Sequence, residues 1–499
     1  MPRLGRATPP GHLPAPVQPE GVGIVHLGIG AFHRAHQAVY TEHAARLTGD
    51  RRWGILGVTQ RSPRVRDQLR PQGGLYTVLT ADASGSSLEV IGSVVDVADP
   101  RDETPRVLAA IAAPSTHVVT LTVTEKGYTR RADGALDLTR VRPDLDALAA
   151  DAGRGETLAG AAPAGSPIGL LVRGLAARHR AGGAPLTVLC CDNLTDNGRL
   201  VSRLVSEAVD AALPGDAGAG LRVWLAEAVT FPSSMVDRIV PAATEAQRAA
   251  AAVELGARDE GLVVGEPFSQ WVIEDRFAGP RPAWDLVGAV LTDDVGPYER
   301  AKLRLLNGTH SLVAYAGALA GHATIADAVA DPAIAEHARR YLFDDALPTL
   351  VAPAGLDLRA YGEQILERFA NPHTGHTTAQ VAMDGTQKIP IRWGGVLADR
   401  LAAGTVPHGV TPALAAWAVY VRERVLAGER VDDPRADELA AAVRAASAAG
   451  GDAVVRSLLA LPGLLLPATL DRPGLVDEIV VRARALGWAP ATAGEGAPR

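Results

Sequence analysis

The stretch Gly23-Ile-Val-His-Leu-Gly-Ile-Gly-Ala-Phe-His33 decides the fold of this 499-residue chain. A short apolar run leads directly into Gly28-Ile29-Gly30, and residues with helical periodicity follow over Phe32–Leu47. Glycines between a strand and a helix allow a tight turn and a close approach of the backbone to a pyrophosphate, which free N–H groups at the helix end then bind. We therefore expect Gly28, Ile29, Gly30, Ala31 and Phe32 to bind a dinucleotide. His33 stands where a third glycine is usual, and an ordinary glycine-rich turn is the alternative.

Short β-rich runs alternate with helical stretches through the first part of the chain. The expected strands are Gly23–Leu27, Gly54–Val58, Val118–Val123 and Leu186–Cys190, and Ile168–Ala181 is one of the helices between them. Such alternation is typical of a parallel, doubly wound sheet. Two later apolar runs, Val223–Val229 and Trp271–Ile273, are expected to add strands at its edge.

The end of the second expected strand bears on the choice of cofactor. An acidic residue there binds the adenosine ribose of NAD, but Gly54–Val58 is followed by Thr59-Gln60-Arg61-Ser62. Arg61 and Ser62 are suited to a 2′-phosphate instead, unless Arg61 is a solvated loop residue. NADP therefore stays open beside NAD.

The pattern changes after about Pro297. Helix start signals recur at Asp331-Pro332, Asp357, Thr411-Pro412 and Asp433-Pro434, and amphipathic stretches follow most of them. The apolar window from Ser311 to Ala330 contains His322, Thr324 and Asp327, which favours a buried helix over a membrane span. We expect a flexible tail over residues 1–20, a nucleotide-binding domain over 21–290 and a mostly α-helical domain over 291–499.

Composition excludes several classes of protein. The net charge is −7 and no run of five basic residues occurs, which argues against nucleic acid as a partner. The N-terminal stretch to Glu20 lacks the apolar segment of a signal peptide. Cys190 and Cys191 are sequence neighbours and form no disulfide framework, which suits a reducing cytoplasm. We expect a cytoplasmic protein, monomeric or a small homo-oligomer, that acts on a small molecule.

Only three of the 49 basic residues are lysines: Lys126, Lys302 and Lys388. Arginine stays protonated in proteins, whereas a desolvated lysine loses its proton readily and can act as a base. A chain that otherwise uses arginine therefore marks its own candidate bases, although chance survival of three lysines is the alternative.

Lys302 begins a stretch with three further polar residues. On an ideal α-helix, with about 100° per residue, Glu299, Lys302, Asn307 and His310 all lie on one side. A base, an amide, an imidazole and a carboxylate on one stripe favour a catalytic site, because such a stripe is normally apolar. The alternative is a turn at Asn307-Gly308 with Lys302 on a solvated helix end.

Further polar residues follow other expected strands. Leu186–Cys190 leads into Cys191-Asp192-Asn193, at the sheet edge where ligands bind in open α/β folds. Asn193 and Asn307 together would make an oxyanion hole, in which two amide donors converge on one oxygen. Asp237-Arg238 adds an acid–base pair, although such a pair is more often a salt bridge.

Other chemistries find little support in the sequence. His33 and His36 lie three residues apart, but without a third ligand at fixed spacing we expect no metal site. A Gly-x-Ser-x-Gly elbow and a phosphate loop of the Gly-x4-Gly-Lys-Ser/Thr type are both missing from the sequence.

At these residues the chain resembles the mannitol dehydrogenase family of long-chain, metal-independent polyol dehydrogenases. The resemblance runs from about Gly23 to about Trp393, over GIVHLGIGAFHRAHQAVYTEH, LTVTEKGY, CDNLTDNG, TFPSSMVDRIVPA, EPFSQWVIED, KLRLLNGTHS and AMDGTQKIP. It implies a Rossmann-type N-terminal domain and a mostly helical C-terminal domain. It also implies hydride transfer between a nicotinamide, expected to be that of NAD, and C2 of an open-chain sugar derivative.

The resemblance implies a role for each residue above. Lys302 matches the general acid–base lysine, Asn193 and Asn307 the oxyanion hole, and His310 a substrate-positioning histidine. Glu299 matches a carboxylate that gates proton exchange with solvent, and Asp237 and Lys388 match residues that line the sugar site. We also expect Arg61 and Glu125 to contact the cofactor, and Lys126 and Gln380 the substrate.

One departure bears on the substrate. Mannitol 2-dehydrogenases tend to carry Arg eight residues before the lysine of the DGxxKxP stretch. In this chain that lysine is Lys388, and the position eight residues before it is Gln380. The surrounding phrase, together with Glu125-Lys126-Gly127-Tyr128, looks more like the D-mannonate oxidoreductase (fructuronate reductase) branch. We expect D-mannonate and D-fructuronate as substrates. Mannitol 2-dehydrogenase, a mannitol-phosphate or other polyol dehydrogenase, and a non-catalytic nucleotide-binding sensor are the alternatives.

Overall fold

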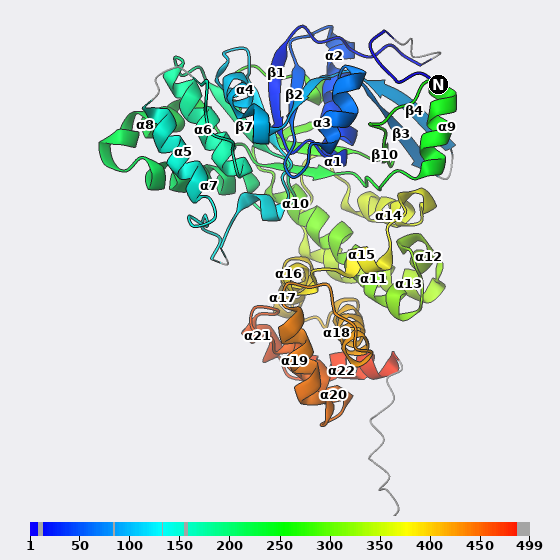
Figure 1. Cartoon of the computed structure of the whole chain (residues 1–499). Coiled ribbons are helices and arrows are strands. Elements are labelled where there is room, and N and C mark those ends of the chain that lie inside the picture. Colours follow the sequence, from blue (N-terminus) through cyan, green and yellow to red (C-terminus); the bar gives the residue numbers. More distant parts are fainter. Residues whose placement is uncertain (8–12, 83–84, 132, 154–157, 487–499) are drawn as a thin grey trace, which may run out of the picture. The chain divides into compact units, whose positions relative to one another are not determined.

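A computed structural model describes residues 1–7, 13–82, 85–131, 133–153 and 158–486 of the chain. The chain divides into two compact units, Met1–Gly296 and Pro297–Arg499 (Figure 1). Each unit has its own architecture.

A six-stranded parallel sheet forms the centre of the first unit. Its spatial order is β5-β2-β1-β6-β7-β8, which is the strand order of the Rossmann fold. The strands are β1 (Val22–Leu27), β2 (Gly54–Val58), β5 (Val94–Ala98), β6 (Val118–Leu121), β7 (Leu186–Cys190) and β8 (Val229–Thr230). The predicted doubly wound sheet is confirmed, and the strand order reverses between β1 and β6, where such folds bind their ligands.

Helices cover both faces of this sheet (Figure 1). They are α1 (Ala31–Ala35), α2 (Gln37–Thr48), α3 (Arg64–Leu69), α4 (Pro100–Ala112), α5 (Arg142–Ala152), α6 (Pro167–Arg180), α7 (Asn197–Ala212) and α8 (Ala219–Ala228). A further helix, α9 (Glu245–Leu255), packs in a separate core with Leu79 and Val90. Successive side chains of β1 point to opposite faces of the sheet. Val25 and Leu27 belong to a core with α4, α6 and α7, whereas Ile24 belongs to a core with α1 and α2.

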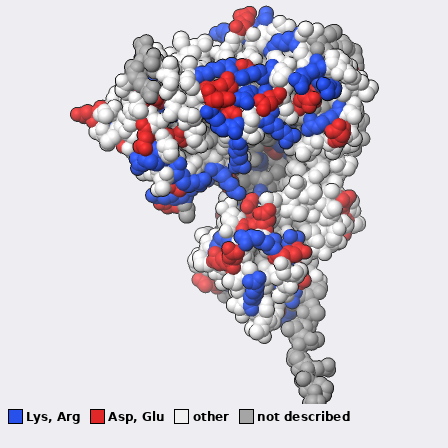
Figure 2. Space-filling view, in the orientation of Figure 1, with Lys and Arg blue, Asp and Glu red and all other residues white. Residues whose placement is uncertain are grey.

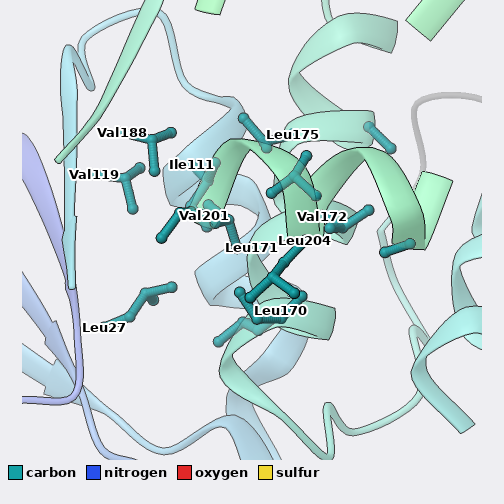
Figure 3. Close-up of a cluster of buried hydrophobic side chains, with 14 of the residues drawn as sticks. Leu27, Ile111, Val119, Leu170, Leu171, Val172, Leu175, Val188, Val201 and Leu204 are labelled. Carbon is teal, nitrogen blue, oxygen red and sulfur yellow. The ribbon is translucent and has the colours of Figure 1, made fainter. Parts of the chain in front are cut away.

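Figure 3 shows the first of these cores. Leu27, Val119 and Val188 project from three strands, and Ile111, Leu171 and Val201 face them from helices α4, α6 and α7. All six are fully buried or nearly so. Because β1, β2, β5, β6 and β7 carry apolar side chains on both faces, the centre of the sheet is packed from both sides, which fixes the carboxyl ends of its strands.

Two small sheets accompany the large one. One has the order β10-β3-β4, with β3 (Tyr76–Asp82), β4 (Gly85–Ile91) and β10 (Val263–Gly265). The other has the order β12-β11-β9, with β9 (Ser234–Asp237), β11 (Gln270–Glu274) and β12 (Val290–Thr292). The prediction that Trp271–Ile273 extends the large sheet is therefore wrong, because these residues pair with β9 and β12.

The predicted strand Val223–Val229 is also wrong. Residues Ala219–Ala228 form helix α8, and only Val229 and Thr230 pair with β7. The run LRVWLAEAV reads equally well as a helix with one buried face, and Leu221 and Trp224 are its buried residues. Short apolar runs do not discriminate between the two structures.

The second unit is mostly helical, as predicted. Its helices are α10 (Gly296–Ala301), α11 (Gly308–Leu319), α12 (Ile325–Ala330), α13 (Pro332–Arg340), α14 (Leu358–Phe369), α15 (Thr378–Ala382), α16 (Gly385–Ile389), α17 (Gly395–Ala402), α18 (Val410–Leu426), α19 (Ala436–Ser447), α20 (Gly451–Leu459), α21 (Pro467–Leu470) and α22 (Leu475–Ala485). Three π-helical segments interrupt them: η5 (Lys302–Asn307), η6 (Tyr341–Ala346) and η9 (Pro390–Gly394).

Two of the four predicted helix starts are confirmed. The carboxylates of Asp331 and Asp357 cap α13 and α14 by accepting backbone N–H groups of the first turn. Helix α18 instead begins before Thr411, since the distant Asp345 accepts the N–H groups of Gly409 and Val410 at 2.6 and 3.0 Å.

Asp433 does not cap a helix either. Its carboxylate accepts the N–H and the hydroxyl of Thr386 at 2.8 and 2.5 Å, and α19 begins only at Ala436. The carboxylate also accepts the Arg435 N–H at 2.8 Å, so the tertiary contact and a local bond share the side chain that the sequence pattern assigned to a cap.

The window from Ser311 to Ala330 forms helices α11 and α12 with a break between them. Within the described parts of the chain, no helix is both long and apolar enough to cross a membrane. On the face shown in Figure 2, cationic and anionic side chains are interspersed over the first unit.

Candidate active site

The glycine loop after β1 has the geometry that a dinucleotide needs. Gly28 has φ +94°, and a Cβ there would lie 2.3 Å from the Thr122 carbonyl oxygen, so only glycine fits between β1 and the end of β6. The N–H groups of Gly28 and Ile29 donate to the Val58 carbonyl at 2.9 and 3.0 Å. A Cβ on Gly30 would meet nothing nearer than 3.8 Å, so this residue fronts the open space that a pyrophosphate would occupy.

His33, which replaces the third glycine, is part of the core beneath this loop. Its ring is 1 % exposed and stacks on His26 at 3.4 Å with 14° between the ring planes. His26 in turn contacts the hydroxyls of Thr120 and Thr122 at 2.7 and 2.9 Å. Burial lowers the pKa of His26 to about 3 and that of His33 well below its usual value, so both rings are neutral at physiological pH.

His36 has different surroundings from His33. Its Nε2 contacts the Gln270 carbonyl at 2.9 Å, and its ring packs against Phe32, Tyr40 and Trp271. Both histidines of this pair thus serve aromatic packing around α1.

A cavity of about 350 Å³ opens beside the glycine loop, at the carboxyl ends of β1 and β2. It brings together residues far apart in the sequence. Its lining is Leu27, Gly28, Val58, Thr59, Gln60, Arg61, Pro100, Lys126, Gly127, Thr129, Arg140, Ala164, Gly165, Ser166, Pro167 and Leu170. Arg61 was predicted to contact the cofactor and does line this cavity, as does Lys126, whereas Glu125 is exposed beside it.

The sequence patterns did not identify Arg140 or the turn at Ala164–Pro167 as part of this cavity. Neither belongs to a motif, and only the fold carries them to the end of β2. No local signal would have found them.

The carboxylate of Asp192 holds together the ends of β6 and β7. It accepts the N–H groups of Val123 and Thr124 at 2.8 and 3.0 Å and the Tyr128 hydroxyl at 2.6 Å. Thr124 has φ +65°, a strained conformation for a β-branched residue, and the bond to Asp192 stabilises it. Asp192 thereby positions both the Glu125–Tyr128 turn and its own neighbour Asn193, which is exposed in the loop before α7.

The loop that carries Asn193 is fixed at its other end by Asn197. The Asn197 amide donates to the carbonyls of Asp192 and Ser234 at 2.9 and 2.7 Å and accepts the Ser234 N–H at 3.0 Å. Asp237 ends the adjacent strand β9 and is buried. The predicted catalytic residue Asn193 therefore lies in a loop that is hydrogen-bonded at both ends, and the predicted substrate residue Asp237 lies at the end of a strand.

In the second unit the predicted catalytic stripe lies on one continuous helical rod, α10–η5–α11. Glu299 belongs to α10, Lys302 and Asn307 are the first and last residues of η5, and His310 belongs to α11. The assumed α-helical spacing is wrong between residues 302 and 307, because this segment is a π-helix. Its i→i+5 hydrogen bonding brings residues five apart about one turn from each other, so Lys302 and Asn307 share a face more closely than an α-helix allows.

Side chains from η6 and η9 bind the carbonyl groups of this π-helical rod. Tyr341 donates to the Arg304 carbonyl at 2.8 Å, Arg392 to the Asn307 carbonyl at 3.1 Å and Trp393 to the Gly308 carbonyl at 3.0 Å. A Cβ on Gly308 would lie 2.0 Å from the Tyr341 hydroxyl. Asn307-Gly308 is therefore not a turn: Gly308 is the one residue small enough to admit Tyr341 against the rod.

His310 lies in an aromatic and cationic setting. Its ring stacks on Phe369 at 4.6 Å and on His376 at 5.6 Å. Burial is the main cause that lowers the pKa of His310 well below its usual value, and neighbouring groups add to it: His376, Arg392, Lys388 and Arg368. Nε2 of His310 and Nδ1 of His376 are buried and have no hydrogen-bond partner among the described residues.

The last two predicted substrate residues lie nearby in the chain but differ in exposure. Lys388, on α16, is half-buried and its Nζ donates to the Val381 carbonyl at 3.3 Å. Gln380 is exposed and caps α15: its N–H donates to the Thr377 hydroxyl at 3.1 Å and its Oε1 accepts the Thr377 N–H at 3.3 Å.

The predicted residues thus fall into two groups, one in each unit. The first unit holds the glycine loop, Arg61, Glu125, Lys126, Asn193 and Asp237. The second unit holds Glu299, Lys302, Asn307, His310, Gln380 and Lys388.

Two family models match the chain over nearly its whole length. Residues 22–286 match the mannitol dehydrogenase Rossmann domain, and residues 294–486 match the mannitol dehydrogenase C-terminal domain.

Relatives carry two different names. D-mannonate oxidoreductase of Escherichia coli (strain K12) is 40% identical over 465 residues, 91% of each chain. Mannitol 2-dehydrogenase of Phaeosphaeria nodorum is 37% identical over 433 residues, 85% of this chain and 74% of that protein.

Solved structures agree with this grouping. The ternary complex of Pseudomonas fluorescens mannitol 2-dehydrogenase with NAD and D-mannitol is 30% identical, with a TM-score of 0.79 over 97% of this chain and 96% of that one. D-sorbitol dehydrogenase in substrate-free form is 28% identical, with a TM-score of 0.80 over 97% and 98%. The chain is a dehydrogenase that belongs to the mannitol dehydrogenase family.

Proposed function

We propose that this enzyme interconverts a secondary alcohol and a ketone at C2 of an open-chain sugar acid, with D-mannonate and D-fructuronate as the first choice. The observation that carries the choice of an acid is the set of cations whose charges act on His310, namely Arg368, Lys388 and Arg392. A substrate carboxylate would make charge-assisted hydrogen bonds to these cations, which are stronger than the bonds that Lys388 and Arg392 make to neutral acceptors. The unpartnered nitrogens of His310 and His376 also favour a polar ligand at this place.

The dinucleotide would be held in the first unit. Gly28, Ile29, Gly30, Ala31 and Phe32 offer the loop and the start of α1 to the pyrophosphate, and Arg61 and Glu125 flank the cavity beside it. The nicotinamide, when bound, accepts or supplies the hydride. Binding of NAD(H) is supported by the NAD complex of the P. fluorescens relative.

We assign the proton chemistry to Lys302. In alcohol oxidation its neutral amine removes the hydroxyl proton while hydride leaves the same carbon, and in reduction its ammonium returns that proton to the ketone oxygen. The amides of Asn193 and Asn307 stabilise the negative charge that develops on this oxygen. His310, neutral because of its lowered pKa, orients the sugar, and Glu299 exchanges the proton of Lys302 with solvent.

Mannitol 2-dehydrogenase is the second candidate. Relatives with that name share 37% of residues with this chain, and the P. fluorescens structure holds D-mannitol. Gln380 argues against it on sequence, but its exposed position as a cap of α15 weakens that argument, since a capping residue is selected for the helix start as well.

The test is a reduction screen read as absorbance at 340 nm. NADH and NADPH are each paired with fructuronate, tagaturonate, fructose and fructose 6-phosphate. We expect the highest kcat/KM with fructuronate. A kcat/KM for fructose that equals or exceeds it would replace the sugar-acid proposal with the mannitol one, and turnover of none of these ketones would refute the dehydrogenase proposal itself.

We further infer a cytoplasmic location, because Cys190 and Cys191 are both free and buried. Fractionation of the source cells, with activity measured in each fraction, tests this.

A further inference from the structure

Three cations line the cavity at the end of β2. Arg61, Lys126 and Arg140 come from three separate segments and converge on this one space of about 350 Å³. Among the residues that the structure describes, the side chains of these three make neither an ion pair nor a hydrogen bond. The lining contains no aspartate or glutamate.

The arginines around the cavity behave differently. Arg66 binds Asp102 at 3.1 Å, Arg70 binds Asp96 and Glu103 at 3.1 and 2.9 Å, and Arg101 binds Asp99 at 2.5 Å. Asp96, Asp99, Asp102 and Glu103 are therefore already paired with other arginines. Arg61, Lys126 and Arg140 therefore place three positive charges around one cavity. These charges repel one another, and a bound anion would offset the repulsion.

The position of the cavity identifies the anion. It borders the carboxyl end of β2, where Rossmann folds place the adenosine ribose, with an acid for the 2′-hydroxyl of NAD and a cation for the 2′-phosphate of NADP. Here Thr59, Gln60 and Arg61 follow β2 directly. The pyrophosphate has its own partners in the glycine loop, so the cations at the ribose end are left for another phosphate.

We propose that Arg61, Lys126 and Arg140 bind the 2′-phosphate of NADP(H), so that this enzyme uses NADP(H) at least as efficiently as NAD(H). The proposal rests on the proposed dehydrogenase function. Arg61 is the principal contact, because it alone follows β2 itself, and Lys126 and Arg140 close the pocket from the turn after β6 and from the segment before α5.

Binding of adenosine fragments tests the pocket without any turnover. Calorimetric titration of the full chain with adenosine 2′,5′-bisphosphate and with AMP compares the same adenosine with and without the 2′-phosphate. We expect the bisphosphate to bind more tightly by about 10-fold or more, the worth of one charge-assisted hydrogen bond. The preference should shrink as salt rises from 50 to 500 mM, roughly a threefold shorter screening length.

Substitutions test whether Arg61 and Arg140 form the phosphate-binding pocket. Arg61→Ala and Arg140→Ala should each reduce the preference for the bisphosphate over AMP by about 10-fold, and Arg61→Glu should abolish it. Arg444→Ala removes an exposed arginine from α19 of the second unit and should leave the preference unchanged. Thermal melts of every variant verify folding, which these exposed positions should not disturb.

Kinetics separate the failure of this proposal from the failure of the dehydrogenase function. We expect kcat/KM for NADPH to equal or exceed that for NADH with the best ketone. Equal binding of bisphosphate and AMP, together with a more than tenfold preference for NADH, would overturn the 2′-phosphate proposal and leave the dehydrogenase intact. If neither cofactor supports reduction and neither fragment binds, the proposed function itself fails.

Discussion

At the scale of single residues, we propose that the chemistry depends on Lys302, one of three lysines in a chain that otherwise uses arginine. Lys302 is 6 % exposed and opens the π-helical segment that ends at Asn307. We predict that Lys302→Ala lowers kcat by roughly 10²- to 10⁴-fold, the usual worth of a general base. Lys302→Arg should be equally inactive, since a guanidinium does not give up its proton.

Steady-state assays of both variants, with and without added small amines, check this prediction. Partial rescue of Lys302→Ala by an amine supports the role of the base. Near-normal turnover by Lys302→Arg would remove Lys302 from the mechanism.

A second prediction at the residue scale concerns the buried histidines and the stability of the protein at acidic pH. Burial holds the pKa of His26 at about 3 and those of His33 and His310 well below the ordinary value of 6.5. Below pH 6.5 these histidines become protonated in the unfolded chain but stay neutral in the folded protein. The free energy of unfolding therefore decreases as pH falls. Each such histidine costs up to about 1.4 kcal/mol per pH unit in this window.

Melting temperatures between pH 7.5 and 5 should therefore fall, and they should fall less in His33→Phe, which keeps a flat ring against His26 but removes one titrating group. Replacement of the exposed His373 by Gln serves as control and should follow the native curve. A melting temperature independent of pH over this range would contradict the prediction.

How far the sequence predicts a residue's role depends on whether its partner is local. Gly28 was identified because it belongs to a local strand–glycine–helix pattern, although the carbonyl that leaves room only for glycine belongs to the distant Thr122. Arg140 was missed, and Asp433 was wrongly assigned to a cap, because their surroundings come from other parts of the chain. Local patterns carry no information about such contacts.

At the scale of elements, the π-helical segment η5 could not be predicted with an α-helical wheel, which assumes about 100° per residue. Within η5, the carbonyl groups of Arg304 and Asn307 are bound by Tyr341 and Arg392, and Trp393 binds the carbonyl of Gly308, the next residue. Residues from η6 and η9 thus hold Lys302 and Asn307 in register on one face. The sequence analysis predicted that Glu299, Lys302, Asn307 and His310 share one helical rod but assumed the wrong pitch, because hydrophobic periodicity does not resolve a single wide turn.

The corresponding prediction concerns Tyr341→Phe, which removes the hydroxyl that donates to the Arg304 carbonyl at 2.8 Å. We expect a loss of stability of about 1 kcal/mol and a drop in kcat with little change in KM for the dinucleotide. Tyr298→Phe is the matched control, since its hydroxyl donates at 2.5 Å to the Ala354 carbonyl outside η5. Equal effects on kcat in both variants would show that the bond to η5 has no special part in catalysis.

At the scale of the whole molecule, the fold class followed from the sequence because two periodicities dominate it. Alternating strands and helices specified the Rossmann sheet of the first unit, and recurring helix starts specified the helical second unit. The small sheets escaped prediction: β9, β10 and β12 each span four residues or fewer and leave almost no pattern, and the seven-residue strands β3 and β4 were not recognised. Site residues were found where motifs carried them, and their roles stay predictions that the variants above test.

A whole-molecule prediction is that catalysis needs no metal. Across the described residues, no three His, Cys, Asp or Glu side chains are grouped as metal ligands, and Lys302 with two amides would supply the base and the polarised oxygen that a zinc ion otherwise provides. Prolonged treatment with a chelator, followed by dialysis and assay, should leave kcat unchanged. Loss of activity that zinc restores would refute this.

The last prediction concerns charge. The protein carries a net charge of −7 and should repel an anionic substrate, yet Arg368, Lys388 and Arg392 concentrate positive charge around His310. If that local field serves a sugar carboxylate, salt should weaken it. We expect kcat/KM for fructuronate to fall as salt rises from 50 to 500 mM, while kcat/KM for uncharged fructose stays nearly constant.

Lys388→Met should lower kcat/KM for fructuronate by about 10-fold or more, which corresponds to the loss of one charge-assisted hydrogen bond, and should lower kcat/KM for fructose less. Arg444→Ala is the control for a lost surface charge. The same salt dependence for both ketones would mean that these cations serve the protein's own structure, and mannitol-type chemistry would then be the better assignment.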